Sequence, residues 1–214
     1  QLAFAQSDVM SYAYEGTNLF DAAVPGFSTI AALYTEQVQI VTLDPTLTNV
    51  SDLAGKTVSV GDAGSGTYFN AVDILSAYGI DAENDINPVY ESFGTSADSL
   101  QDGKIDAAFI VAGAPTTAVT SLAATKKIYL VGFDDEHIMK LIVESPYYSK
   151  NVIAKEVYGT DDDVTTVAVG AVVIARDDVS VNDVFNFLYG VFEKQDEISK
   201  AHAKGLELDL EFAA

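Results

Sequence analysis

The strongest constraint on the fold comes from residues 53–79, where a β-branched run leads into a glycine-rich loop and then into a helix-like pattern. Residues 56–60 are typical of a buried strand, and residues 61–66 contain three glycines and one serine. Residues 67–78 carry apolar side chains at helical spacing, and Gly79 stands where a helix-ending glycine is expected. This order predicts a helix N-terminus at the carboxyl end of a strand.

The rest of the chain repeats this alternation. Strands are expected at residues 1–8, 86–90, 105–113, 127–133 and 165–179, and helices at residues 96–104, 116–126, 134–144 and 181–204. Residues 27–43 are expected to form two short strands broken near Thr35 and Glu36, and Ser96 is the expected N-cap of its helix. Strands that alternate with helices of about ten residues indicate an α/β fold with a largely parallel sheet.

A chain of 214 residues can form one large domain or two lobes of about 100 residues. The turn-rich residues 44–56 and the long apolar strand at 165–179 are interpreted as crossings between two lobes. We therefore place residues 1–43 and 166–214 in lobe I, and residues 44–165 in lobe II.

An internal similarity supports two lobes of the same plan. Residues 2–13 and 107–118 both show a strand, a turn of polar or small residues and a helix start. In lobe II this unit follows the glycine loop by about 50 residues. The matching loop of lobe I would then precede Gln1, so the chain is expected to be incomplete at its N-terminus.

The charge balance limits the partners. The chain has 32 acidic and 11 basic residues, which gives a formal net charge of −21. Nucleic acid and anionic membrane surfaces need clustered Lys or Arg, so neither is an expected partner. No apolar run approaches the roughly 20 residues that span a bilayer, and the chain is not expected to be membrane-inserted. An acidic surface favours a soluble monomer and suggests a salty milieu.

The residue types in the sequence give little support for a metal site or a bound cofactor. No cysteine occurs, which excludes disulfides, thiolate catalysis and Cys-ligated metals. The two histidines, His137 and His202, are interpreted as solvated helix residues. Three adjacent acids, Asp161–Asp163, do not converge on a cation without a turn, so a solvated loop is the favoured interpretation. We predict no cofactor, no metal site and no catalytic residue.

Three enzymatic interpretations of the glycine loop fail at named positions. A phosphate loop needs Lys followed by Ser or Thr after the last glycine, where Thr67 and Tyr68 stand. A dinucleotide fingerprint needs a third glycine where Phe69 stands. A nucleophile elbow around Ser65 needs flanking glycines, but Ala63 and Thr67 occupy those positions.

Two interpretations stay open. In the first, Gly64 and Gly66 let backbone N–H groups point at one spot, Ser65 and Thr67 add hydroxyl donors, and the helix dipole favours an anion. Such an anion-binding site at a helix N-terminus suits a small carboxylate and needs no lysine. In the second, the loop is a tight turn between strand and helix whose glycines serve packing.

Four segments together resemble a known family. Residues 5–16, 52–71, 100–119 and 145–178 are similar, in this order, to the TAXI family, the TRAP-associated extracytoplasmic immunogenic solute-binding proteins. The similarity covers nearly the whole chain. It implies a two-lobed periplasmic-binding-protein-like (type II) α/β fold, a periplasmic or extracytoplasmic location, and delivery of ligand to the membrane permease subunits of a TRAP transporter.

The resemblance also implies a ligand and a site. Family ligands are small organic anions and amino acids, with glutamate-like and dicarboxylate compounds expected. The ligand-binding residues it implies are Gln6, Ser7, Asp8, Gly64, Ser65, Gly66, Thr67, Tyr68, Ala112, Gly113, Ala114 and Pro115. A Gly-rich segment that family members carry before the first of these is absent here.

Asp8 has two interpretations. It could accept a hydrogen bond from a ligand ammonium, which would favour an amino acid over a dicarboxylate. It could equally cap a helix that begins at Val9.

Two other function classes are alternatives to the transport receptor. The first is a ligand-sensing domain of the same fold without a transporter. The second is an enzyme, which is disfavoured because no pair of titratable groups is placed for acid–base work.

Overall fold

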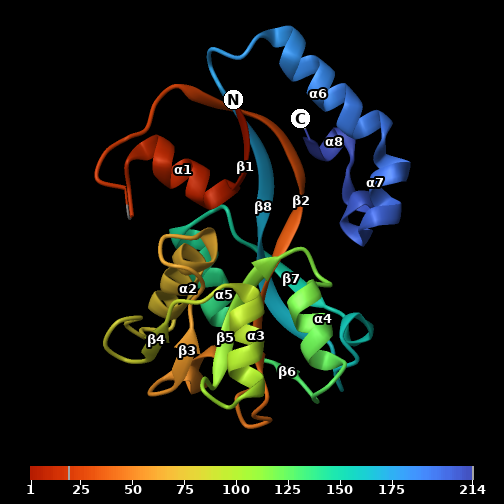
Figure 1. Ribbon diagram of the computed structural model, residues 1–214. Coiled ribbons are helices and arrows are strands. Elements are labelled where there is room, and N and C mark those ends of the chain that lie inside the picture. Colours follow the sequence, from red (N-terminus) through yellow and green to blue (C-terminus); the bar gives the residue numbers. More distant parts are fainter. Residues whose placement is uncertain (19, 214) are drawn as a thin grey trace. The chain divides into compact units, whose positions relative to one another are not determined.

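The computed structural model describes residues 1–18 and 20–213, and it divides the chain into two compact units (Figure 1). Unit 1 comprises residues 1–36 and 169–214, and unit 2 comprises residues 37–168. The chain passes between the units within two long strands, β2 (Phe27–Thr42) and β8 (Val164–Arg176). The units therefore divide inside these strands rather than after residues 43 and 165. That the two units act as lobes stays a prediction.

Strands and helices alternate along the chain, which confirms the predicted α/β class. The remaining strands are β1 (Leu2–Gln6), β3 (Thr57–Ser59), β4 (Asn87–Val89), β5 (Ala107–Ala112), β6 (Tyr129–Leu130) and β7 (Ser149–Ile153). The helices are α1 (Ser7–Glu15), α2 (Gly66–Ala77), α3 (Phe93–Gln101), α4 (Thr117–Ala123), α5 (Asp135–Glu144), α6 (Val181–Glu193), α7 (Gln195–Ala201) and α8 (Leu210–Ala213). Short 3-10 turns are η1 (Val50–Leu53), η2 (Lys155–Val157) and η3 (Ala203–Glu207).

The sheet of unit 2 is mixed rather than largely parallel. β3 pairs in parallel with both β4 and β5, as expected for strands linked by crossover helices. β5 and β6 pair antiparallel with β2, and β7 pairs antiparallel with β8. The difference arises because β2 and β8 enter from the other unit, so no crossover helix within unit 2 sets their direction.

The core of unit 2 covers both faces of β5. Ala108 and Ile110 belong to an apolar cluster with residues of α3 and α4, and β5 also contacts α2. Between them, Phe109 is fully buried. α2 packs with α5 and α3 packs with α4, and Figure 1 shows these two helix pairs. A strand buried on both faces explains why residues 105–113 read as a continuous apolar run.

Two predicted features of the strands and caps were wrong. β2 is one continuous strand of 16 residues, so the chain does not break at Thr35 and Glu36. The N-cap of α3 is Ser92, whose hydroxyl accepts from the Thr95 N–H at 3.4 Å. Ser96 lies inside the helix, where its hydroxyl shares a 2.8 Å hydrogen bond with that of Ser59 in β3. Its role is to join helix and strand.

Unit 1 contains β1, α1, α6, α7 and α8. β1 pairs antiparallel with β8, from Leu2 opposite Ala175 to Gln6 opposite Ala171. The single helix expected at residues 181–204 is two helices, because α6 ends at Glu193 and α7 begins at Gln195. Among the helices of residues 1–18 and 20–213, none is both long and apolar enough to cross a membrane.

Candidate functional site

Three helix N-termini share one edge of the unit 2 sheet. β4, β3 and β5 are parallel neighbours, so their carboxyl ends lie at the same edge. α2, α3 and α4 each begin shortly after one of these strands, with Ser65, Ser92 and Thr116 as N-caps. Ligands of α/β proteins bind beyond the carboxyl ends of the strands. Unit 2 therefore brings the predicted residues 64–68 and 112–115 to one edge of its sheet.

The first turn of α2 leaves main-chain donors available. The Ser65 hydroxyl accepts from the Tyr68 N–H at 3.2 Å, and the Ser65 carbonyl accepts from the Phe69 N–H at 3.2 Å. In the described part of the chain, no protein atom accepts from the N–H groups of Gly66 and Thr67. The first N–H groups of a helix have no partner within it. These two amides can therefore bind a ligand anion.

Gly61 and Gly64 in this loop are required for different structural reasons. Gly61 has φ +84°, and a Cβ there would lie 2.8 Å from the Thr67 side chain. Gly64 has φ +73°, but a Cβ there would meet nothing within 4 Å. Close packing thus accounts for Gly61, while Gly64 is needed only for its left-handed backbone.

The hydroxyl of Tyr68 is bound by an acidic partner. Its hydroxyl donates to Glu83 Oε1 at 3.2 Å, and Tyr90 donates to the same oxygen at 2.7 Å. The two rings lie 5.6 Å apart. The hydrogen bond to Glu83, with a smaller effect of burial, raises the pKa of Tyr90 to about 12. The Tyr68 hydroxyl is already engaged, so any ligand contact would use its ring.

Three polar groups of the loop Ala112–Pro115 are bound by the protein itself. The Gln39 amide donates to the Ala112 carbonyl at 3.0 Å, and the Gln37 side chain accepts from the Ala114 N–H at 3.1 Å. The Gly113 carbonyl accepts from the Thr116 hydroxyl at 3.3 Å. A ligand contact by this loop stays a prediction. Such a contact would use polar groups of the loop other than the three that these hydrogen bonds engage.

Sequence reasoning missed the side chains that hold this loop. Gln39 is fully buried, and its side-chain oxygen accepts from the Tyr158 hydroxyl, which in turn accepts from the Thr116 N–H at 2.6 Å. A signal was present, since Gln37 and Gln39 are polar residues two apart in an otherwise apolar β-branched run. Buried polar side chains in a strand require partners.

The residues predicted from the first lobe lie in unit 1. Gln6 is the N-cap of α1, which begins at Ser7, so Asp8 does not cap a helix starting at Val9. The Ser7 hydroxyl accepts from the Gly170 N–H at 3.0 Å. Asp8 is fully buried within the first turn of α1, where the helix dipole favours a carboxylate.

Glu36 is a further titratable group of unit 1 that sequence reasoning did not select. Burial, together with the nearby charge of Asp8, raises its pKa to about 7, while a hydrogen bond from Gln6 and the charge of Lys204 act in the opposite direction. Lys204 is itself buried and lies 2.6 Å from Glu207. The sequence signal for Glu36 is an acid in a β-branched run, at the place where the sequence predicts a break between two strands.

A family model described as the NMT1-like family matches residues 1–214. The chain belongs to the NMT1-like family.

Solved structures show the likeness of this NMT1-like chain to other proteins. Protein AF1704 from Archaeoglobus fulgidus matches with a TM-score of 0.50 and 16% identity, over 95% of this chain and 60% of that chain. A putative L-cystine ABC transporter from Listeria monocytogenes matches with a TM-score of 0.49 and 17% identity, over 88% and 66%. A mutant of ArgBP from T. maritima matches with a TM-score of 0.47 and 16% identity, over 82% and 58%.

The likeness to AF1704 concerns the fold alone, because identity is low. The NMT1-like chain spans less than two thirds of the length of each of these three proteins.

His137 of this NMT1-like chain is not a solvated helix residue. Its ring stacks on Tyr78 with centroids 3.8 Å apart, and its Nδ1 lies 2.8 Å from Asp134 Oδ1. Burial would raise the pKa of Asp134, but hydrogen bonds from the backbone and ring of His137 and from Asn49 together hold it below its usual range. His202 is exposed, and its Nδ1 accepts from the Lys204 N–H at 3.1 Å.

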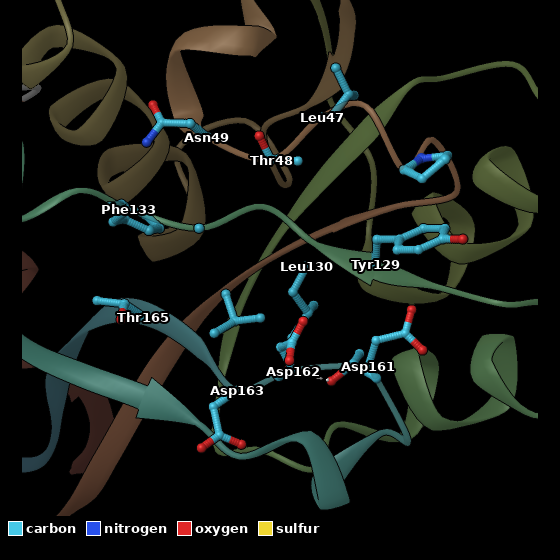
Figure 2. Close-up of a pocket in the computed structure, with 14 residues that line it drawn as sticks. Leu47, Thr48, Asn49, Tyr129, Leu130, Phe133, Asp161, Asp162, Asp163 and Thr165 are labelled. Carbon is cyan, nitrogen blue, oxygen red and sulfur yellow. Dashed lines mark hydrogen bonds between the residues drawn. The ribbon is translucent and has the colours of Figure 1, made fainter.

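A cavity of about 380 Å³ lies elsewhere in unit 2 of the NMT1-like chain and contains none of the predicted site residues (Figure 2). Its walls come from residues 45, 47–49, 129, 130, 132, 133 and 160–165. Among residues 1–18 and 20–213, no group of three or more His, Asp or Glu side chains is arranged to hold a metal ion.

Proposed function

We propose that this NMT1-like protein is an extracytoplasmic solute-binding receptor that captures a small carboxylate ligand. The observation that carries the proposal is that the main-chain amides of Gly66 and Thr67 have no protein acceptor in the described residues. Both lie at the carboxyl ends of the parallel strands β4, β3 and β5. A helix N-terminus in this position attracts an anion without a cationic side chain.

The two-unit architecture supports binding by closure. Two compact α/β units joined through two strands are suited to hinge bending, as in periplasmic binding proteins. Gln6, Ser7 and Asp8 in unit 1 are proposed as the second set of contacts, and the resemblance to TAXI proteins supports a TRAP permease as the partner. The same resemblance supports a glutamate-like amino acid or a dicarboxylate as ligand.

The first test is calorimetric titration of the protein with L-glutamate and with succinate, followed by the Gly66→Asp variant. The new carboxylate places a negative charge where the ligand's would sit, so affinity should fall at least tenfold. An acid in the first helical turn does not weaken the helix, which separates lost binding from unfolding.

Gly66→Asn is the matched control, because it adds nearly the same volume without the charge. It should lose less affinity than Gly66→Asp. Undiminished binding by the Asp variant would remove α2 from the site. A steep fall of affinity with added salt would contradict anion capture by main-chain dipoles.

A further inference from the structure

The cavity of about 380 Å³ in unit 2 is remote from the α2 edge of the sheet. Thr42, at the end of β2, pairs with both Tyr129 and Ala107, the first residue of β5. The cavity is walled by the residues that follow β2 and by the segment around Tyr129. It therefore lies where β5 begins, whereas α4 follows the other end of that strand.

The charges on the cavity wall are unbalanced. Asp161, Asp162 and Asp163 all line it. The Lys127 ammonium lies 2.7 Å from Asp161, and the Asp163 carboxylate accepts from the Lys155 N–H at 3.0 Å. In the described part of the chain, the Asp162 carboxylate accepts no hydrogen bond. Of these three carboxylates only that of Asp161 is paired with an ammonium among the described residues, in a protein whose net charge of −21 already concentrates cations around it.

An aromatic ring adds a second attraction for a cation. Lys127 Nζ lies 5.3 Å from the centroid of the Tyr129 ring while it is paired with Asp161. Two lining residues, Tyr129 and Asp161, thus already bind one ammonium of the protein's own, although Lys127 itself does not line the cavity. Figure 2 shows Asp161, Asp162, Tyr129 and Leu130 among the residues that line the cavity.

The rest of the lining suits a short carbon chain. Five apolar side chains contribute: Pro45, Leu47, Leu130, Phe133 and Val164. The volume is near the lower end of the range for small-molecule sites. A cavity with apolar walls and a few charged groups fixes the orientation of a ligand that is itself part apolar and part charged.

We propose that this cavity is a binding site for a small organic cation, a short aliphatic amine whose ammonium group faces Asp162 and whose carbon chain lies along Leu130 and Phe133. The site is separate from the α2 edge, so it stands whether or not α2 binds a carboxylate.

The test is a titration of the whole chain, followed by backbone amide NMR, with n-butylamine hydrochloride at constant ionic strength. n-Butanol is the neutral control of the same length. We expect the amine to shift the signals of residues 45–49, 129–133 and 160–165 and the alcohol to leave them nearly unchanged. Equal shifts with the alcohol, or amine shifts spread over the whole surface, would overturn the proposal.

Charge-matched variants separate this site from general attraction to an acidic protein. Asp162→Asn should weaken amine binding about threefold or more, and Tyr129→Leu about two- to fivefold. Asp102→Asn removes the same charge from another exposed aspartate of unit 2, which pairs with Lys104 at 2.8 Å, and it should leave the titration unchanged. Identical affinities for Asp162→Asn and Asp102→Asn would contradict the site.

Discussion

At the scale of single residues, Glu36 shows how burial changes a side chain's chemistry. It lies in β2 at the last position of the first segment of unit 1, near Asp8 and Lys204. Burial and the like charge of Asp8 disfavour its ionised form, and its pKa is raised to about 7. The hydrogen bond from Gln6 does not compensate for this. The folded protein therefore holds a proton on Glu36 at pH values where an unfolded chain would release it.

This shift predicts a pH dependence of stability. Because the folded pKa exceeds the unfolded one, Glu36 contributes stability below about pH 4.5 that is lost as pH rises through about 7. With Glu36 present, the free energy of unfolding should fall by roughly 1–3 kcal/mol between pH 5 and pH 8. In the Glu36→Gln variant this fall should disappear. Urea denaturation at both pH values measures it. The exposed Glu193→Gln is the control, and equal pH profiles for the two variants would refute the prediction.

At the scale of elements, the β5–α4 loop is shaped by side chains from other parts of unit 2. Tyr158 reaches it from the segment after η2, and Gln39 reaches it from β2. The N–H of Thr116, the N-cap of α4, is satisfied by the Tyr158 hydroxyl. A helix end that is not exposed needs such a partner. The loop is therefore built as part of the packed unit.

Tyr158→Phe tests this description. The change keeps the ring but leaves the Thr116 N–H and the Gln39 side-chain oxygen without the hydroxyl that bonds both. The free energy of unfolding should fall by about 1–3 kcal/mol in chemical denaturation. Tyr14→Phe, at a residue that is 63% exposed, should change it by less than about 0.5 kcal/mol. Similar values for the two variants would show that the network contributes little.

At the scale of the whole molecule, the dominant property is the net charge of −21. The six Lys–Asp, Lys–Glu and Arg–Asp pairs within 4.0 Å in the described residues engage few of the 32 acids. Most of these pairs are exposed, and exposed pairs contribute little. Repulsion among the remaining carboxylates works against the compact state.

Added salt should therefore stabilise the protein. Raising NaCl from about 0.05 to 1 M shortens the Debye length from more than 10 Å to about 3 Å and screens the repulsion. Each 1 kcal/mol gained would raise Tm by about 2–4 °C. Thermal unfolding followed by circular dichroism measures this. KCl at the same ionic strength should act equally, and a Tm that falls with salt would contradict the screening argument.

The sequence by itself determined the α/β class, the position of α2 and the exclusion of cysteine chemistry, because hydrophobic period, glycine spacing and composition are local properties. Of the predicted site, it located the α2 N-terminus within one residue. Tertiary structure decided the rest. Neighbours distant in sequence make Ser96 a partner of Ser59, keep β2 unbroken through Glu36, and engage the loop at Ala114 with Gln37. Long-range partners of this kind leave no periodic trace in a single sequence.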